Sequence, residues 1–379
     1  MQILTVDIGT GTQDIYLYQS DLSIENGFKL VMPSPTMIVG QSIQQATLRG
    51  DTILLLGTTM GGGPNHWAAE QHIRTGYKIF STPAAARTFN DDLDWVQREM
   101  GIVVVSEEEA LSIPETRRII MQDFDYQSIS SAFDAFGVSL SPAAVGVAVF
   151  DHGEAPPDVS DRQFRFDYLE ERMRVDNRLL SLAYPAHGVP PIMSRMRAVM
   201  QSAGSLPCPL ILMDTAPAAV LGATMDTVIR DRDRVIIVNI GNFHTLAFLL
   251  GPAGVEGLFE HHTGLLDVLR LEKYLFALAD GTLAREEIYN DHGHGALILD
   301  AAPFSLDAQD WKVAITGPRR AMMNTSGLPL YYAVPFGDMM LTGCFGLLNA
   351  IAEYVPELSE VIQQDLTNSS GGRAPWDFV

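Results

Sequence analysis

A short pattern that occurs twice in this chain constrains its fold more than any other feature. Val6-Asp7-Ile8-Gly9 recurs as Val238-Asn239-Ile240-Gly241. In each copy a run of β-branched residues leads into a glycine turn, and a threonine follows the turn. A four-residue match arises easily by chance, but both copies stand where a strand ends. We therefore interpret them as a duplication in which each copy begins its own lobe.

Strands and helices alternate along most of the chain. The segment from Ile3 to Tyr18 is typical of strand, glycine turn and strand, and the region 66–100 is expected to be mostly helical. Further strands are predicted at Thr52–Gly57, Ile102–Val105, Ala144–Phe150, Leu210–Asp214, Val235–Asn239, Lys312–Thr316 and Leu330–Val334. Further helices are predicted at about Ile192–Ser202, Ala218–Gly222, Asp267–Ala279 and Met340–Tyr354. This alternation indicates the α/β class.

Composition excludes several classes of function. The chain has 379 residues, enough for two domains, and a formal charge of -21 that would repel nucleic acid and anionic membranes. Its two cysteines, Cys208 and Cys344, are too few and too far apart for a disulfide framework, a zinc ribbon or an iron–sulfur cluster. No apolar run approaches the ~20 residues of a membrane span. The first residues form a strand rather than a signal peptide, so we expect a cytoplasmic protein.

The first glycine turn has the residue types of a phosphate-binding loop. In Asp7-Ile8-Gly9-Thr10-Gly11-Thr12 the glycines allow close backbone approach, and successive N–H groups with the Thr10 and Thr12 hydroxyls can bind an anion. Asp7 can hold Mg²⁺, usually through water. The alternative is an ordinary hairpin turn, which a lone motif of this kind favours.

Two later turns could complete a nucleotide pocket. The second copy contributes Asn239, Gly241, Asn242 and Thr245, and the two hairpins could clamp a polyphosphate from both sides. Further on, Thr316-Gly317-Pro318 ends a buried strand, where a glycine lets a purine lie against backbone and a following helix favours negative charge. The alternatives are an Asn-rich hairpin and a strand–turn–helix junction common in α/β proteins.

Two segments rich in small residues are candidates for closely crossing helices. They are Asp214-Thr215-Ala216-Pro217-Ala218-Ala219 and the stretch from Gly337 through Gly343-Cys344-Phe345-Gly346. Small side chains let two helices approach closely, which suits a hinge between lobes. Close packing without motion is the alternative.

In this order the five segments resemble the motifs of the actin, sugar-kinase and heat-shock chaperone ATPase superfamily. The resemblance runs from Ile3 to Ala350, with phosphate motifs at Asp7–Asp14 and Asn239–Thr245, connecting helices at Asp214–Gly222 and Gly337–Ala350, and an adenosine motif at Thr316–Arg320. It implies a two-lobed actin-like ATPase fold of duplicated ribonuclease-H-like domains with a central nucleotide cleft. It also implies ATP and Mg²⁺ as cofactors.

The resemblance assigns roles and boundaries. Asp7 would hold hydrated Mg²⁺, and Asp214 would orient the attacking water or an acceptor hydroxyl. Gly317 and Pro318 would flank adenosine. The phosphates would be bound by residues of the two glycine turns, which are Gly9, Thr10, Gly11, Thr12, Asn239, Gly241, Asn242 and Thr245. The first lobe would span 1–225 with insertions, and the second 226–339. A helix at about 340–356 would pack back on the first lobe, and 357–379 would form the C-terminal tail, loosely held from Thr367.

The second phosphate motif departs from the superfamily pattern. It usually begins with aspartate, and here the residue is Asn239, whose amide cannot give a metal the charge of a carboxylate. Acetate-kinase-like relatives also lack this acid and carry a Gly-Asn pair similar to Gly241-Asn242. Asn239 therefore leaves phosphate binding intact but puts the hydrolytic mechanism of actin in doubt.

More narrowly, the chain resembles a prokaryotic family labelled as a pyruvate formate-lyase activating protein. A radical activating enzyme of that kind needs a three-cysteine cluster motif, whereas this chain has two distant cysteines. ATP-driven activators of acyl-CoA dehydratases belong to the same superfamily, and they also carry cluster cysteines that are missing here.

Histidines cluster outside the nucleotide motifs. They occur in Glu260-His261-His262-Thr263-Gly264 and Asp291-His292-Gly293-His294-Gly295, and His244 lies within the second phosphate loop. We expect His244, His261, His262 and His294 at the acceptor end of the cleft, as a base or metal ligands. The alternative is that His-Gly turns cap helices and bind backbone.

Two functions remain open from the sequence. The protein transfers the γ-phosphate of ATP to a small acceptor or couples ATP hydrolysis to a metabolic step, with closure of the lobes. Alternatively, it is a nucleotide-gated activator that signals its ATP or ADP state to a protein client. The oligomeric state stays open.

Overall fold

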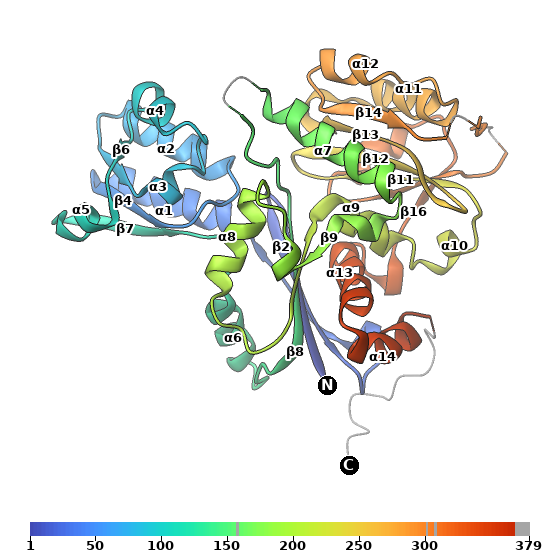
Figure 1. Ribbon diagram of the computed structural model, residues 1–379, viewed down its shortest axis with the longest axis horizontal. Helices are drawn as coiled ribbons and strands as arrows, with labels where there is room; N and C mark the ends of the chain where they lie inside the picture. Colours follow the sequence, from blue (N-terminus) through green and yellow to red (C-terminus); the bar gives the residue numbers. More distant parts are fainter. Residues whose placement is uncertain (157–158, 301, 307–308, 368–379) are drawn as a thin grey trace.

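The computed structural model describes residues 1–156, 159–300, 302–306 and 309–367. Over these residues the structure has three sheets, two of them with six strands and one with four. Figure 1 shows the four-stranded sheet and its helices on one side, and the second six-stranded sheet on the other, with the first between and below them. Within the described residues, no helix combines the length and apolar character needed to cross a bilayer.

The first six-stranded sheet contains the amino-terminal hairpin. Its strand order is β3 (Phe28–Pro33), β2 (Thr12–Gln19), β1 (Gln2–Ile8), β8 (Pro142–Val149), β10 (Leu210–Asp214) and β9 (Ala183–Pro185). β1 is antiparallel to β2 and parallel to β8, and β8 is parallel to β10. The central strands are buried along nearly their whole length, as expected for strands covered on both faces.

The second six-stranded sheet repeats this arrangement. Its order is β14 (Gly295–Ile298), β13 (Gly254–His262), β12 (His244–Gly251), β11 (Val235–Ile240), β15 (Val313–Thr316) and β16 (Leu330–Tyr332). β11 is antiparallel to β12 and parallel to β15. The two sheets thus share five strands in the order 3-2-1-4-5, an antiparallel meander of three followed by two parallel strands. The sixth strand, β9 in the first sheet and β14 in the second, is antiparallel to its neighbour and lies at opposite edges of the shared pattern. This duplicated ribonuclease-H-like topology confirms the predicted actin-like α/β fold.

The four-stranded sheet is inserted between β3 and β8. Its order is β6 (Val103–Val104), β5 (Ile79–Ser81), β4 (Thr52–Gly57) and β7 (Thr116–Met121), with every pairing parallel. Its helical segments are α1 (Pro35–Arg49), α2 (Pro64–Arg74), α3 (Pro83–Ala86), α4 (Leu93–Trp95), η2 (Val96–Met100) and α5 (Glu107–Ser112).

The expectation that 66–100 is mostly helical was wrong at β5. This strand has three residues, and pairing with β4 and β6 on either side fixes it. A strand that short has no period of its own in the sequence, so its tertiary partners decide its conformation.

The remaining helices cover the sheets. They are η1 (Ile24–Asn26), α6 (Tyr126–Asp134), α7 (Asp161–Val175), η3 (Leu179–Leu182), η4 (Ala186–Gly188), α8 (Ser194–Ala203), α9 (Thr215–Ala223), α10 (Thr227–Arg230), η5 (Thr263–Leu265), α11 (Val268–Ala279), α12 (Arg285–Asn290), η6 (Arg320–Thr325), η7 (Pro335–Gly337), α13 (Thr342–Tyr354) and α14 (Pro356–Thr367). α7 precedes β10 in sequence but packs beside β14 of the second sheet (Figure 1). Arg162 on α7 donates to the Gly293 carbonyl at 2.6 Å.

α13 begins later than the predicted connecting helix. Phe336 and Gly337 have φ angles of 51° and 75°, so the backbone turns left-handed before the helix can start at Thr342. α13 packs on β1, β8 and β10, and α14 follows it at Pro356. The rest of the predicted tail, residues 368–379, lies outside the described residues.

α9 and α13 cross with their backbones in contact. A Cβ atom added at Gly222 would overlap the Thr342 carbonyl, and one added at Gly346 would overlap the Ala218 carbonyl. The small residues noted in the sequence are therefore required for this crossing. The same two helices lie in the largest buried apolar cluster, which includes residues of both six-stranded sheets.

Replacing Gly346 with alanine should destabilise the protein. The new methyl group has only backbone to displace, so we expect Gly346→Ala to lower the free energy of unfolding by about 1–3 kcal/mol. Urea denaturation measures the change. Gly264→Ala is the matched control, because no atom lies within 4 Å of the added Cβ, and we expect a change of at most about 0.5 kcal/mol. Equal changes in the two variants would contradict the crossing argument.

Candidate functional site

The two duplicated hairpins face each other across a cleft. In the first, the Gly9 N–H donates to the Thr12 carbonyl at 2.9 Å, and in the second the Gly241 N–H donates to the His244 carbonyl at 2.9 Å. The turns thus close with the same hydrogen bond. A Cβ atom on Gly11 would meet the Asn242 side-chain nitrogen at 2.5 Å, so the tips of the two loops are nearly in contact.

One pocket of about 790 Å³ brings the five sequence motifs together. The first loop contributes Asp7, Gly9, Thr10 and Thr12, and the second contributes Asn239, Gly241, Asn242 and His244. α9 contributes Thr215, the β15 turn contributes Gly317 and Pro318, and the start of α13 contributes Thr342 and Gly343. Segments from distant parts of the sequence therefore meet at the crossing of α9 and α13.

Asp7 and Asp14 form a carboxylate pair on the floor of this pocket. They are direct cross-strand neighbours on β1 and β2, and both line the pocket while being largely buried. Thr215 donates a hydrogen bond of 2.5 Å to Asp7 Oδ1, and a Cβ atom on Gly343 would overlap Oδ2. Asp14 Oδ1 is buried without a hydrogen-bond partner.

Burial and mutual repulsion disfavour the charged forms of this pair. Burial, opposed by the Thr215 hydrogen bond, raises the pKa of Asp7 to about 7. Burial and the charge of Asp7 raise the pKa of Asp14 to about 8. Two facing carboxylates with an unpartnered oxygen have the donor chemistry of a Mg²⁺ site, because Mg²⁺ prefers oxygen ligands and would remove the repulsion.

The second hairpin has no such pair. Asn239 occupies the position of Asp7, and its cross-strand neighbour, in the position of Asp14, is Leu246. Asn239 lies beside Gly317, whose φ angle of 95° and close approach to the Ile240 carbonyl leave no room for a side chain. Both acids of the first half are therefore replaced by uncharged residues in the second.

Three predicted residues stand apart from the pocket wall. Gly11 lies at the loop tip, and Thr245 is buried with its hydroxyl 2.9 Å from that of Thr263. The Asp214 carboxylate is engaged by Arg165 Nη1 at 2.6 Å and by the Ala216 N–H at 3.3 Å. The Asp214 carboxylate therefore already has two partners, and its role in orienting water stays a prediction.

Arg165 is the buried centre of an ion network. From α7 it donates through Nε to Glu260 of β13 at 2.9 Å, and its Nη1 donates to Asp214 and to the Asp151 carbonyl at 2.7 Å. Burial would raise the pKa of Glu260, but Arg165 and His294 outweigh it and hold that pKa well below its usual range. Burial raises the pKa of Asp214, and Arg165 opposes the rise.

A second pocket, of about 1110 Å³, adjoins the first. Gly9, Thr10, Phe150, Arg195, Phe243 and His244 line both pockets. The second is closed by the glycine loop Met60–Gly63 of the inserted unit and by Asp151–Gly153 after β8. Trp67 of α2 stacks on Phe243 with ring centroids 5.9 Å apart, so the insert and the second phosphate loop touch at this edge.

Arg195 is fixed at the boundary between the pockets. Its Nε donates to Asp123 at 2.6 Å and its Nη1 donates to the Phe150 carbonyl at 2.7 Å. Asp123 also accepts from the Gly61 N–H at 3.2 Å, which ties the glycine loop to the same arginine. The arginine is held in place before any ligand binds.

The predicted histidines separate into two groups. His244, His262 and His294 form one group, with ring centroids 4.9–5.1 Å apart; His244 and His262 line the second pocket, and His294 is buried beside them. His261 faces another way, because its Nε2 lies 3.2 Å from Asp291 and its ring stacks on Tyr274. Burial lowers the pKa of His244 well below its ordinary value and that of His262 to about 4.

Sequence reasoning missed three residues of this site. They are Asp14, Arg195 and His152, which joins the histidine group from the loop after β8. Asp14 could have been found by counting the hairpin register from Asp7. Arg195 and His152 lie in segments without a motif, and only the tertiary fold brings them to the cleft.

The family described as "Putative pyruvate format-lyase activating enzyme (DUF1786)" matches residues 60–322. No curated protein matches the chain significantly. A solved structure of the ethanolamine utilization protein EutJ from Carboxydothermus hydrogenoformans is similar over 92% of this chain and 89% of its own, at 11% identity and a TM-score of 0.31. A structure described as the PilM-PilN type IV pilus biogenesis complex is similar over 97% and 99%, at 11% identity and a TM-score of 0.35. A ROK hexokinase from Thermus thermophilus is similar over 67% and 47%, at 13% identity and a TM-score of 0.22.

The raised pKa values of the carboxylate pair predict a pH dependence of stability. Unfolded aspartates titrate near pH 3.9, so between about pH 4 and pH 8 the folded pair binds more protons and stability falls as pH rises. Asp14→Asn removes one ionisation, so its stability relative to wild type should increase from about pH 5 to pH 8. The free energy of unfolding of the variant relative to wild type should rise on the order of 1.4 kcal/mol per pH unit. This slope applies over the pH range in which the Asp14 carboxyl is protonated in the folded protein but ionised in the unfolded chain.

Urea denaturation of both proteins at the two pH values, without added metal, measures this difference. Asp134→Asn changes an exposed acid of α6 and serves as the control. The prediction fails if Asp14→Asn shows the same pH profile as wild type.

Arg165 should be essential for stability. Arg165→Leu leaves Asp214 and Glu260 buried without their counter-charge, and we expect a loss of about 3–5 kcal/mol in the free energy of unfolding. Arg178→Leu is the control, because Arg178 also pairs with two carboxylates, Asp176 and Glu353, but at the surface. There we expect a loss of at most about 1 kcal/mol. Similar losses of stability in both variants would show that the buried ion network stabilises the protein no more than a surface ion pair does.

Proposed function

We propose that this chain, which belongs to the DUF1786 family, binds Mg-ATP between its two six-stranded sheets and transfers the γ-phosphoryl group to a small acceptor. One observation carries the proposal. The pocket lined by the phosphate and adenosine motifs opens into a second pocket, and the two share the first phosphate loop at Gly9 and Thr10. A phosphoryl group held at that loop would face whatever molecule occupies the second pocket.

The first pocket supplies the groups that a nucleotide needs. Gly9 to Thr12 and Gly241 to Asn242 would bind the β- and γ-phosphates from opposite sides, and Gly317 with Pro318 would lie against adenosine. Asp7 and Asp14 would hold Mg²⁺, which neutralises phosphate charge when bound. Asn239 and Leu246 offer no carboxylate, so the metal would lie on the side of the first sheet.

Arg195 is the residue we assign to the transferring group. It borders both pockets, and its hydrogen bonds to Asp123 and the Phe150 carbonyl fix its orientation in advance. A preorganised guanidinium stabilises charge on a phosphoryl group without rearranging during the reaction. Asp214 would act indirectly, by holding Arg165 and presenting the adjoining Thr215 to Asp7.

Closure of the cleft would exclude water from the transfer. We keep the lobes at 1–225 and 226–339, and they would pivot at the crossing of α9 and α13. The stacked pair of Trp67 and Phe243 lies at the edge where the insert meets the second loop. Movement about the pivot would change this contact.

The same contact favours a second candidate function. Trp67 is 56% exposed although it stacks on Phe243 of a nucleotide loop. An exposed surface that depends on the nucleotide loop could report ATP or ADP to a protein client. An acceptor that strongly stimulates ATP turnover supports the transferase, whereas slow turnover and a client complex that changes with nucleotide support the activator.

The radical chemistry named in the family description does not fit this chain. Iron–sulfur clusters are held by cysteine thiolates, and the sequence contains Cys208 and Cys344 alone. Cys344 is fully buried on α13, with its Sγ 3.1 Å from the Asp14 carbonyl. We therefore derive no step through such a cluster.

Calorimetry with Mg-ATP tests the proposal. Wild type should bind Mg-ATP and gain about 2.7 kcal/mol of stability at a ligand concentration 100 times Kd. Asp7→Asn should lose at least about tenfold in affinity for Mg-ATP while its affinity for ATP with chelator changes little, because the carboxylate acts through the metal. Asp134→Asn is the control for loss of an acidic charge outside the cleft.

The absence of Mg-ATP binding by wild type would overturn the nucleotide proposal. Equal affinity and equal turnover of wild type and Asp7→Asn would remove Asp7 from the metal site.

A further inference from the structure

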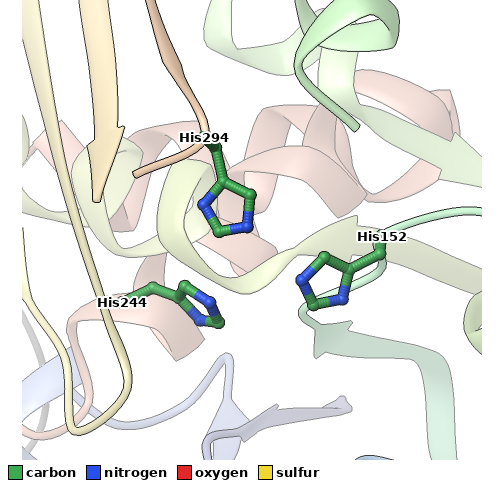
Figure 2. Close-up of side chains that lie close together, drawn as sticks. All are labelled: His152, His244 and His294. Atoms are coloured by element: carbon green, nitrogen blue, oxygen red, sulfur yellow. The ribbon is translucent and has the colours of Figure 1, made fainter. Parts of the chain in front are cut away.

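Three histidines from separate segments converge beside the second pocket, where His152 and His244 line the wall and His294 is buried behind them. His152 follows β8, His244 begins β12, and His294 precedes β14. Figure 2 shows their rings pointing toward a common space, and one nitrogen from each lies within 4.8 Å of the others. The three positions are far apart in sequence, so their convergence is a product of the fold.

Two of these histidines, His244 and His294, have buried nitrogens without the partners that buried imidazoles normally have. His294 is fully buried, and its Nε2 has no hydrogen-bond partner; neither does His244 Nε2. A buried histidine that serves packing alone usually satisfies its polar atoms, because an unpaired one costs about 1–3 kcal/mol. The stacking of His244 on Phe150, with ring centroids 4.1 Å apart, gives its nitrogen no partner.

A second layer of residues supports the cluster. Glu260 Oε1 lies 2.9 Å from His294 Nδ1, although the ring is not aligned for a regular hydrogen bond. Glu260 is in turn held by Arg165. A carboxylate behind a histidine is the usual companion of a metal-ligating imidazole, since it fixes the ring and raises its basicity.

We propose that His152, His244 and His294 bind one divalent transition-metal ion of the zinc type. Three imidazoles with an open fourth position are a ligand set of catalytic zinc sites. Mg²⁺ prefers oxygen ligands and would remain at the carboxylate pair of the first pocket, so the two metals select different sites. His262 lies beside the cluster, 4.9 Å from His244 between ring centroids, and also lines the pocket.

The spacing of the donors sets a condition on binding. Tetrahedral ligands about 2.1 Å from a zinc ion lie about 3.4 Å apart. The longest separation between donor nitrogens here, 4.8 Å at most, must therefore shrink by up to about 1.4 Å when the ion binds. His152 and His244 are partly exposed, so side-chain rotation can supply this movement around the fixed His294.

The place of the site indicates what the open position would bind. It faces the second pocket, and His244 belongs to the second phosphate hairpin. If the proposed phosphoryl transfer holds, the ion would bind the acceptor through an oxygen and direct it toward the phosphate loop. The acceptor class would then be a small molecule with a hydroxyl or carboxylate beside its reacting atom.

Metal binding by the full chain tests this site apart from ATP. The protein is treated with chelator, dialysed and titrated with Zn²⁺ by calorimetry in the absence of nucleotide, and Co²⁺ absorption reports the ligand field. Wild type should bind one Zn²⁺ per chain, and bound Co²⁺ should show the intense visible bands of a four-coordinate site. His152→Ala and His294→Ala should each weaken Zn²⁺ binding on the order of 100-fold or more.

His187→Ala is the matched control, since His187 is an exposed histidine of η4 away from the cluster. It should keep wild-type affinity for zinc. Thermal melting of each variant shows whether it folds, and His152→Ala removes a loop residue in case His294→Ala does not fold. Mg-ATP affinity, measured separately, shows whether the nucleotide proposal stands or fails independently.

Three outcomes would overturn the metal site. They are no stoichiometric Zn²⁺ binding by wild type, equal zinc affinity in folded His152→Ala, and equal losses in His187→Ala. Binding of inorganic phosphate with no binding of Zn²⁺ would assign the cluster to an anion instead.

Discussion

The buried guanidinium of Arg165 is the interaction on which the site depends. It comes from α7, yet it binds Asp214 at the end of β10 in the first sheet and Glu260 of β13 in the second. It also covers the Phe150 ring, with 3.7 Å between the guanidinium carbon and the ring centroid. One side chain therefore sets the spacing between both sheets and the aromatic floor of the second pocket. A buried charge of this kind is stable only because both carboxylates remain in place.

The duplicated hairpins show how one backbone design can serve two roles. Each closes with the same glycine-to-carbonyl hydrogen bond, so the loops present similar surfaces to a ligand. Their cross-strand pairs differ in charge, with Asp7 and Asp14 in the first and Asn239 and Leu246 in the second. A cation is therefore favoured on one side of the cleft and uncharged contacts on the other. This asymmetry agrees better with positioning a phosphate chain than with a symmetric clamp.

The sequence predicted the fold well because its main signals are local. Glycine turns at strand ends and the repeated Val-x-Ile-Gly pattern indicate a duplicated sheet, and the structure contains two sheets that share five strands of the same topology. Small residues such as Gly222 and Gly346 predict a close helix crossing, because only they let backbones touch. These features follow from steric rules that operate within a few residues.

What the sequence left out depends on contacts between distant segments. β5 is strand because of its neighbours β4 and β6, and α7 lies on the second sheet although it precedes β10. His152 stands in a loop without a motif, and nothing near it in sequence indicates that His244 and His294 are close. Asp214 matched a motif, but the charge that occupies it, Arg165, comes from α7. A sequence motif therefore does not predict the role of a residue whose charged partner comes from a distant segment.

Charge balance connects the two proposed metal sites. One chain of contacts runs from His294 through Glu260 and Arg165 to Asp214, and the adjoining Thr215 donates to Asp7. Arg165 carries one positive charge, whereas the two carboxylates that it binds carry two negative charges. The Asp7–Asp14 pair adds further negative charge when its carboxyl groups are ionised. Each end of this chain therefore favours a cation, which lowers the cost of keeping carboxylates away from water. A shift of Arg165 would change both ends, so occupancy of one site should affect the other through this contiguous set of polar contacts.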